Sequence, residues 1–301
     1  MKRPAIAGSL LTVQGPPKAM NASQENKILL EWRETAPYWK KHSATLRTMF
    51  RPLTEALIEE AAISEGQSVL DVAGGAGEPS LTIAEKVGAK GRVTCTDAIA
   101  EMVAAAEAAA HQRGLTNIKF RQCTADSLPF ANNTFDTVVS RLGVMFFLDP
   151  LAALREMFRV CKAGGSLSLA VWSRNEVNPF TRIVSDIVSR YVESPAADPD
   201  APGAFRFAEI GKLADVMKNA GAAAVRERLF EFHIEAPIGP EEFWILRSET
   251  SDTLRNKLAK LSANQLSRVK QEVHEAAREF FPNNRMSFPA QMIIVTGRKS
   301  T

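Results

Sequence analysis

The stretch that decides the fold is "VLDVAGGAGEPS", from Val69 to Ser80. An apolar run ends in Asp71, three glycines then fall within four positions, and a helical pattern begins where the stretch ends. A glycine turn between a strand and a helix brings backbone N–H groups and a helix N-terminus next to a ligand. Asp71 stands on the strand itself, where its carboxylate can hold the loop backbone and face an ammonium group. The stretch therefore predicts a ligand site at the carboxyl end of a first strand.

Downstream of this loop, short β-branched or apolar runs alternate with helical stretches. Strands are expected at 91–97, 118–125, 135–142 and 165–173, and helices at 80–88, 100–114 and 150–161. This alternation is typical of a parallel sheet with helices on both faces. Two later strands, at 225–235 and 290–299, are separated by helical stretches and indicate antiparallel pairing at one edge. The predicted fold class is α/β, a Rossmann-like and mostly parallel sheet with an antiparallel edge strand.

The two ends of the chain suggest helical additions to this sheet. We divide the chain into a flexible lead-in at 1–23, an N-terminal helical cap at 24–62, a core at 63–175 and a remainder at 176–301. The remainder completes the sheet and includes a helical insertion at 237–284. We expect this insertion to lie over the ligand end of the sheet as a lid.

The composition is that of an ordinary globular protein. Apolar residues make up 45% and charged residues 24%, and a net charge of +3 is too small to favour nucleic acid or an anionic membrane. The three cysteines form no C-x-x-C pair, which indicates free thiols in a reducing compartment. No apolar run approaches the ~20 residues of a membrane span. We expect a cytoplasmic protein with a small-molecule substrate, no nucleic-acid partner and no membrane span, and a homodimer is left open.

The glycine loop resembles the S-adenosylmethionine loop of class I methyltransferases, which has the form V-L-D-x-G-x-G-x-G. Ala73 occupies the position of the first glycine, where an alanine fits if its φ is negative. A dinucleotide loop of the form G-x-G-x-x-G would need a third glycine where this chain has Ser80. The residues that match the methyltransferase pattern are Val69, Leu70, Asp71, Gly75 and Gly77.

Further motifs follow in the order of this family. Asp97 ends the second expected strand about 20 residues after the glycines, where the family places an acid that binds both ribose hydroxyls. "DAIAEM" at 97–102 resembles D-x-S-P-E-M, and "TADSLPF" at 124–130 resembles D-A-E-x-L-P-F. Residues 140–173 resemble the ubiquinone/menaquinone-biosynthesis-like small-molecule methyltransferases. The resemblance implies a class I methyltransferase sheet that binds S-adenosyl-L-methionine and releases S-adenosyl-L-homocysteine.

The resemblance also implies a set of cofactor-binding residues in the core at 63–175. The family's adenine-contacting aspartate falls on Thr124, and whether Thr124 or Asp126 meets the adenine amino group stays open. Arg141 ends the fourth expected strand, where ligands bind in such sheets, and can face cofactor or substrate. The expected cofactor-binding residues are Asp71, Ala73, Gly74, Gly75, Gly77, Asp97, Ala98, Met102, Thr124, Ala125, Asp126 and Arg141.

No motif identifies a catalytic residue or a metal site. His42 in the cap, His233 on a late strand and Arg141 are the candidates, and the absence of a dedicated base is an equal alternative. Aromatic rings can close over a sulfonium or line an apolar pocket. The expected substrate-pocket residues are Trp32, Tyr38, Trp39, Trp172, Phe243 and Trp244.

The resulting hypothesis is an S-adenosylmethionine-dependent methyltransferase. It would move a methyl group by in-line displacement to an oxygen, nitrogen or carbon of a small, partly apolar acceptor such as a quinol or phenol. We expect this acceptor between the N-terminal helices and the insertion. The chain lacks the N/D-P-P-Y motif of amino-group methylation and the Pro-Cys pair of cytosine-C5 enzymes. One alternative is a cofactor-binding protein without methyl transfer. The other is a NAD-dependent oxidoreductase, although the chain shows no evident catalytic set for that reaction.

Overall fold

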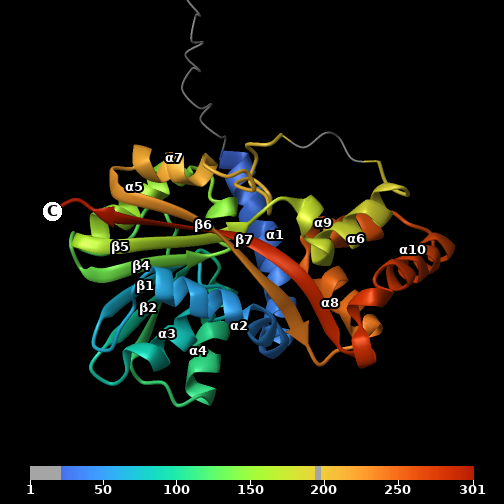
Figure 1. The fold of residues 1–301 in the computed structure, drawn as a ribbon, viewed down its shortest axis with the longest axis horizontal. Coiled ribbons are helices and arrows are strands. Elements are labelled where there is room, and N and C mark those ends of the chain that lie inside the picture. The colour runs from blue at the N-terminus through green and yellow to red at the C-terminus, as the bar shows by residue number, and fades with distance from the viewer. Residues whose placement is uncertain (1–21, 194–197) are drawn as a thin grey trace, which may run out of the picture.

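The computed structural model describes residues 22–193 and 198–301 and contains a seven-stranded sheet flanked by helices (Figure 1). The strand order is β3-β2-β1-β4-β5-β7-β6. β7 lies between β5 and β6 and runs antiparallel to both. The expected Rossmann-like, mostly parallel sheet with antiparallel pairing at one edge is therefore confirmed. The strands are β1 (Ser68–Val72), β2 (Arg92–Asp97), β3 (Ile118–Gln122), β4 (Phe135–Arg141), β5 (Cys161–Trp172), β6 (Ala222–Ala236) and β7 (Met286–Lys299).

Helices connect the parallel strands, so that the carboxyl ends of β1, β2 and β4 meet at one edge of the sheet. The start of α5 shows how local sequence sets a boundary, because Asp149 accepts a hydrogen bond from the backbone N–H of Ala152 and Pro150 takes the first helical position. The helices are α1 (Ala22–Lys41), α2 (Ser43–Glu60), α3 (Ser80–Val87), α4 (Ala100–Gln112), α5 (Pro150–Val160), α6 (Pro179–Ser189), α7 (Lys212–Asn219), α8 (Pro240–Thr250), α9 (Asp252–Leu258) and α10 (Ala263–Ala276).

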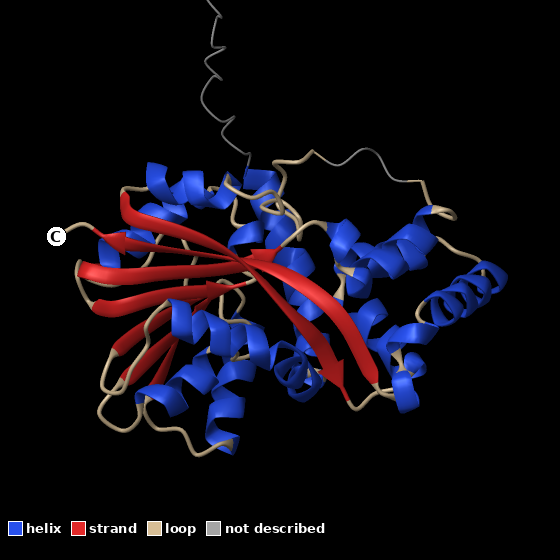
Figure 2. Cartoon of the chain, in the orientation of Figure 1, coloured by secondary structure: helices blue, strands red, loops and turns tan. Residues whose placement is uncertain are grey.

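Strands β6 and β7 extend beyond the rest of the sheet as a two-stranded ribbon (Figure 2). β5 pairs with β7 only from Met292 onward, whereas β6 pairs with β7 from Met286 to Lys299. The first part of β7 thus has β6 as its one paired neighbour in the sheet. The segment between the two strands holds α8, α9, α10 and the 3-10 turns Arg278–Phe280 and Pro282–Asn284. These helices therefore stand at the end of the ribbon, away from the parallel strands.

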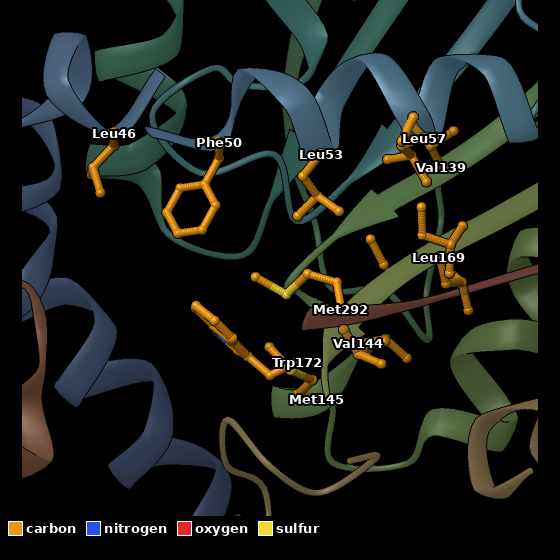
Figure 3. Close-up of a cluster of buried hydrophobic side chains, with 14 of the residues drawn as sticks. Leu46, Phe50, Leu53, Leu57, Val139, Val144, Met145, Leu169, Trp172 and Met292 are labelled. Atoms are coloured by element: carbon orange, nitrogen blue, oxygen red, sulfur yellow. The ribbon is translucent and has the colours of Figure 1, made fainter. Parts of the chain in front are cut away.

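Helix α2 supplies part of the core at the ligand edge. Leu53 and Leu57 are fully buried, and Leu57 points toward Val139 of β4 (Figure 3). Nearer the N-terminus of α2, Phe50 lies edge-to-face with Trp172 at the end of β5, with ring centroids 6.0 Å apart. Burial of such side chains stabilises the fold by about 1.5–3 kcal/mol each. The packing holds α2 across the ends of β4 and β5, and its first turns reach the ligand edge.

The lead-in expected at 1–23 lies, up to residue 21, outside the described residues. No helix of the described part has both the length and the apolarity that crossing a bilayer requires. The three cysteines form no disulfide, and Cys95 and Cys161 are buried as free thiols.

Candidate functional site

A pocket opens at the carboxyl edge of the sheet, between α1, α2 and the loops that follow the first four strands. The loops contribute the glycines and acidic groups, and the helices contribute an apolar wall. The residues of the predicted site that line this pocket are Trp32, Trp39, Ala73, Gly74, Gly75, Asp97, Ala98, Met102, Thr124, Ala125, Asp126 and Arg141.

The glycine loop is fixed to the end of β2 by its backbone. The N–H of Gly74 donates to the carbonyl oxygen of Thr96 at 2.9 Å, and the N–H of Gly75 donates to Oδ2 of Asp97 at 3.0 Å. A Cβ on Gly74 would stand 2.6 Å from Sγ of Cys95, so no larger residue fits there. A Cβ on Gly75 would meet no atom within 4 Å, and its φ is +56°. The bare backbone at Gly75 thus leaves room for close approach of a ligand.

Ala73 does not meet the condition of a negative φ under which an alanine would fit at this position. Its φ is +59°, and Leu142, which follows β4, has a φ of +62°. The left-handed conformation costs an L-residue about 1–2 kcal/mol. The two turns touch, because a Cβ built on Gly143 would lie 2.7 Å from the Cβ of Ala73. Both strained residues line the pocket, which is where such backbone conformations tend to gather in proteins.

Asp71 lies beneath the glycine loop and is not among the pocket-lining residues. It is fully buried, its Oδ2 accepts a hydrogen bond from the Ser80 hydroxyl at 2.5 Å, and its Oδ1 has no partner among the described residues. Burial raises the pKa of this carboxyl to about 7, against the opposing effects of the Ser80 hydrogen bond and of Arg141. In this structure Asp71 therefore joins β1 to the start of α3 and supports the loop from below.

Asp97 presents its carboxylate to the pocket. Its Oδ1 accepts from the N–H of Ile99 at 2.9 Å, and its Oδ2 accepts from Gly75. Burial raises the pKa of Asp97 to about 6, and the backbone hydrogen bonds from Ile99 and Gly75 oppose the shift. The carboxylate is held in place by backbone donors and carries a charge at neutral pH, as an acceptor for hydroxyl groups requires.

Arg141 reaches from the end of β4 under α2. Its Nη1 donates to Thr54 Oγ1 at 2.7 Å and its Nη2 to the carbonyl oxygen of Glu78 at 3.2 Å. Burial lowers the pKa of its guanidinium. Glu78 also lines the pocket, but its carboxylate is bound by Arg113 at 2.7 Å. Arg141 thus ties the glycine loop to α2.

Aromatic side chains cover the pocket from the side of α1. The Trp32 ring lies edge-to-face with Phe146 at a centroid distance of 4.9 Å and with Trp39 at 5.9 Å. Phe146 and Phe147, at the end of the 3-10 turn Val144–Phe146 that comes after β4, line the pocket, although the sequence analysis did not select them. The available signal was an apolar pair just after a strand that ends at the ligand edge. The other lining residues that were not selected are Ile28, Leu29, Ser43, Leu46, Arg47, Phe50, Val72, Ala76, Glu78, Ile99, Cys123, Leu142, Gly143, Leu148, Asp149 and Ala153.

Three predicted residues do not line the pocket: Tyr38 and His42 of the N-terminal cap, and His233 of the edge strand β6. His42 Nε2 contacts Glu249 Oε2 at 2.6 Å. His233 is exposed on β6, with Nδ1 at 3.0 Å from the Ser287 hydroxyl. The Tyr38 ring lies under the guanidinium of Arg255 on α9, 5.1 Å from the ring centroid. In this arrangement neither histidine is placed to act on a molecule in the pocket.

The aromatic residues predicted for the substrate pocket on β5 and α8 are packed into the interior. Trp172 lies against Phe50, and Phe243 is fully buried beside Phe180 and two further phenyl rings. Trp244 is buried as well, and the lining includes no residue of α8 to α10. The insertion instead anchors α1, because the indole N–H of Trp39 donates to the carbonyl oxygen of Thr250 at 3.2 Å. The pocket wall opposite the loops is built by α1 and α2.

Comparisons with known proteins agree with this arrangement. Residues 46–192 match the model of the ubiE/COQ5 methyltransferase family. The uncharacterized protein Rv1405c of Mycobacterium tuberculosis is 43% identical over 122 residues, which cover 40% of this chain and 43% of that protein. The ubiquinone/menaquinone biosynthesis C-methyltransferase UbiE of Cellvibrio japonicus is 37% identical over 135 residues, covering 44% and 53%. The similarity thus spans about half the length of these curated relatives.

Solved structures share the fold over most of the chain. The YcgJ protein of Bacillus subtilis superposes with a TM-score of 0.55 at 23% identity, covering 83% of this chain and 99% of that one. Phosphoethanolamine N-methyltransferase 2 of Haemonchus contortus gives a TM-score of 0.52 at 15% identity, covering 89% and 60%. Residues 46–192 are therefore similar to the ubiE/COQ5 methyltransferase family, and the chain shares the fold of these solved structures.

Proposed function

We propose that the protein is an S-adenosyl-L-methionine-dependent methyltransferase that acts on a small, partly apolar acceptor. One observation carries the proposal. A single pocket joins the glycine loop and the Asp97 carboxylate, on one side, to an aromatic and apolar wall on the other. The first side suits a ribose and an amino-acid tail, and the second suits a sulfonium and an apolar acceptor.

The residues of the pocket fit the cofactor. Both oxygens of Asp97 accept a hydrogen bond from a backbone N–H, and they would also accept hydrogen bonds from the ribose hydroxyls. The open side of Gly75 leaves space for the methionine portion. The adenine would lie near Ile99 and Met102, with Thr124 and Asp126 as the candidates for its amino group. A sulfonium is attracted to aromatic faces, and Trp32 supplies one at this pocket.

The bound cofactor would supply a methyl carbon already activated by the positive sulfur. The protein would contribute alignment of the acceptor, which can be worth about 7–11 kcal/mol, and exclusion of water by the rings of Trp32, Phe146 and Phe147. No histidine, lysine or tyrosine is among the described residues that line the pocket. The carboxylates of Asp126 and Asp149 also line it. We propose an acceptor whose own atom is nucleophilic or readily loses a proton, such as a phenol or an acidic carbon.

Isothermal titration of the protein with S-adenosylhomocysteine tests the cofactor site. We expect binding to weaken strongly in Asp97→Ala, because the ribose loses its acceptor, and to be kept in Asp215→Ala, which removes an exposed carboxylate on α7. NAD serves as the control ligand. Binding of NAD in place of S-adenosylhomocysteine would refute the proposal.

Transfer of a labelled methyl group from S-adenosylmethionine to phenols, quinols and amines then tests the reaction. Transfer that disappears in Asp97→Ala supports it. Tight cofactor binding without transfer to any acceptor of the panel would favour a cofactor-binding protein that does not methylate.

A further inference from the structure

Helix α2 turns one of its faces to the pocket, and this face carries a cation. The residues of α2 that line the pocket are spaced as neighbours on one side of a helix: Ser43, Leu46, Arg47 and Phe50. Figure 3 shows Leu46 and Phe50 on this side of α2. Both are buried, whereas Arg47 is exposed. Arg47 therefore brings a positive charge to a wall of the pocket that is otherwise largely apolar.

Arg47 differs from the next arginine of the same helix. Arg51 lies 3.7 Å from the carboxylate of Glu55, one turn later, and does not line the pocket. The residues of α2 within one turn of Arg47, from Ser43 to Arg51, include no acid. No ion pair joins Arg47 to any residue of the described ranges. Its guanidinium thus keeps its hydrogen-bond donors for a molecule in the pocket.

The other cation of the pocket lining, Arg141, is already compensated. It donates to neutral oxygens of α2 and to the carbonyl oxygen of Glu78. The carboxylates of Glu78 and Asp71 lie close enough to oppose the lowering of its pKa by burial. The lining contains no lysine or histidine among the described residues. Arg47 is therefore the cation that remains for an anionic group of a ligand.

The hydrogen bonds of Arg141 also place Arg47 relative to the glycine loop. Arg141 joins the carbonyl oxygen of Phe50 on α2, at 3.4 Å, to that of Glu78 just after the loop, at 3.2 Å. Arg47 stands one turn before Phe50 and faces the same pocket. β1 separates β4 from β2, at whose end Asp97 lies. A ligand that is held at Asp97 and extends past the glycine loop would therefore bring its far end to the α2 wall.

We propose that Arg47 binds a carboxylate at this wall and that this group is the α-carboxylate of the methyl donor. This inference rests on the proposed function. The donor ends in an amino acid, whose ammonium is attracted by the carboxylates on the loop side, Asp97 and Glu78, and whose carboxylate is repelled by them. A guanidinium holds a carboxylate through two parallel N–H···O bonds. The donor would thus be fixed at two points, the ribose at Asp97 and the amino-acid end at Arg47.

Isothermal titration of the full protein tests the inference with two ligands, S-adenosylhomocysteine and its decarboxylated analogue, which lacks only the carboxylate. We expect S-adenosylhomocysteine to bind about tenfold more tightly, as one hydrogen-bonded charge pair at an exposed side chain would give. Arg47→Met should bind the two ligands alike, with the affinity for the analogue unchanged, and Arg47→Lys should keep part of the preference. Arg51→Met removes an exposed arginine of the same helix outside the pocket and should keep the full preference.

Unchanged binding of the analogue shows that each variant is folded. If S-adenosylhomocysteine binds the wild type but is not preferred over the analogue, the inference fails and the proposed function stands. It also fails if the preference survives in Arg47→Met or disappears in Arg51→Met. If neither ligand binds the wild type, the proposed function itself fails.

A carboxylate on the acceptor is the other source of an anion at this wall. To distinguish the two sources, 4-hydroxybenzoate and its neutral amide are titrated into the protein saturated with S-adenosylhomocysteine. We expect Arg47→Met to leave the ratio of these two affinities unchanged. If the substitution instead removed a preference for the acid and kept the preference for S-adenosylhomocysteine over its analogue, Arg47 would serve the acceptor, and the inference would be overturned.

Discussion

The glycine-loop end of the sheet and the helical insertion both bury charged groups, but they satisfy them differently. At the loop end, both oxygens of Asp97 accept backbone hydrogen bonds, and Arg141 donates to neutral oxygens. In the insertion, Arg247 has an unpartnered Nε and lies on the ring of Phe180. The loop end is held in a binding geometry by hydrogen bonds, whereas the insertion is held by aromatic packing. Ligand binding and stability should therefore respond to mutations in different halves.

The largest effect on ligand affinity is expected from a methyl group added to the glycine loop. In Gly74→Ala the new Cβ would lie 2.6 Å from Sγ of Cys95 and 2.8 Å from Oδ2 of Asp71, so the loop must shift. Displacing a binding element by an ångström can cost about 10²-fold, and we expect S-adenosylhomocysteine affinity to fall by about that factor. Calorimetry measures this affinity. Gly203→Ala is the control, because the nearest atom to a Cβ at that position would be 3.9 Å away. Unchanged affinity in Gly74→Ala would show that the loop tolerates displacement.

A second prediction compares an aromatic ring of the insertion, Phe243, with one of the pocket wall, Trp32. Phe243→Ala should cost about 3–5 kcal/mol of unfolding free energy, because the side chain is fully buried among other phenyl rings, and should leave cofactor affinity unchanged. Trp32→Ala should lower the affinity for S-adenosylmethionine by about tenfold if its ring faces the sulfonium as proposed, at a smaller cost in stability. Urea unfolding and calorimetry on both variants give the two quantities. Equal effects of the two substitutions on affinity would contradict the division of roles.

The same contrast explains what the sequence could predict. The loop, Asp97 and the ends of β2 and β4 follow local patterns, because a strand, a turn and a helix succeed each other within a few residues. The orientation of Asp71 does not follow from such a pattern. Its carboxylate lies below the loop because the hydroxyl of Ser80, nine residues later, donates a hydrogen bond to it there.

For the aromatic residues, local sequence could not predict which rings line the pocket and which lie in the core. Trp32 and Phe243 read alike in sequence, as large rings in helical segments, yet one lines the pocket and the other is in the core. What separates them is tertiary: the β6–β7 ribbon carries α8 away from the parallel strands, while α1 crosses the pocket. Likewise, no local signal shows that Arg247 lacks a carboxylate partner, since its neighbours come from another helix.

The third prediction uses the pH dependence of stability. The pKa of Asp71 is about 7 in the folded protein and near 3.8 when unfolded, so between these values the folded state binds the extra proton. Its contribution to stability is therefore present at low pH and is lost as the pH rises from about 4 to about 7. Asp71→Asn cannot ionise, and it should be more stable than the wild type at pH 8, with the gap closing toward pH 4.

Urea unfolding at pH 4, 6 and 8 measures this gap. Asp97 also titrates near pH 6 in the folded protein, but it is present in both proteins and cancels in the difference. Asp215→Asn, at an exposed position, should show no such trend. A stability difference that stays constant across the three pH values would mean that the Asp71 carboxyl does not ionise in this range.

The smallest effect concerns the strained turn at Ala73. Ala73→Gly removes about 1–2 kcal/mol of left-handed strain but adds about 0.5–1 kcal/mol of chain entropy on unfolding, so a gain of about 0.5 kcal/mol is expected in urea unfolding. Ala62→Gly is the matched control, because Ala62 has a φ of +54° and lies outside the pocket lining. Both substitutions should stabilise the protein. Only Ala73→Gly should also weaken S-adenosylhomocysteine binding, because the Ala73 methyl group packs against the turn at Gly143, which lines the same pocket. If the two variants gained stability alike and neither changed affinity, the strain at Ala73 would be unrelated to the site, and the hydrogen bonds around the loop would suffice to set its geometry.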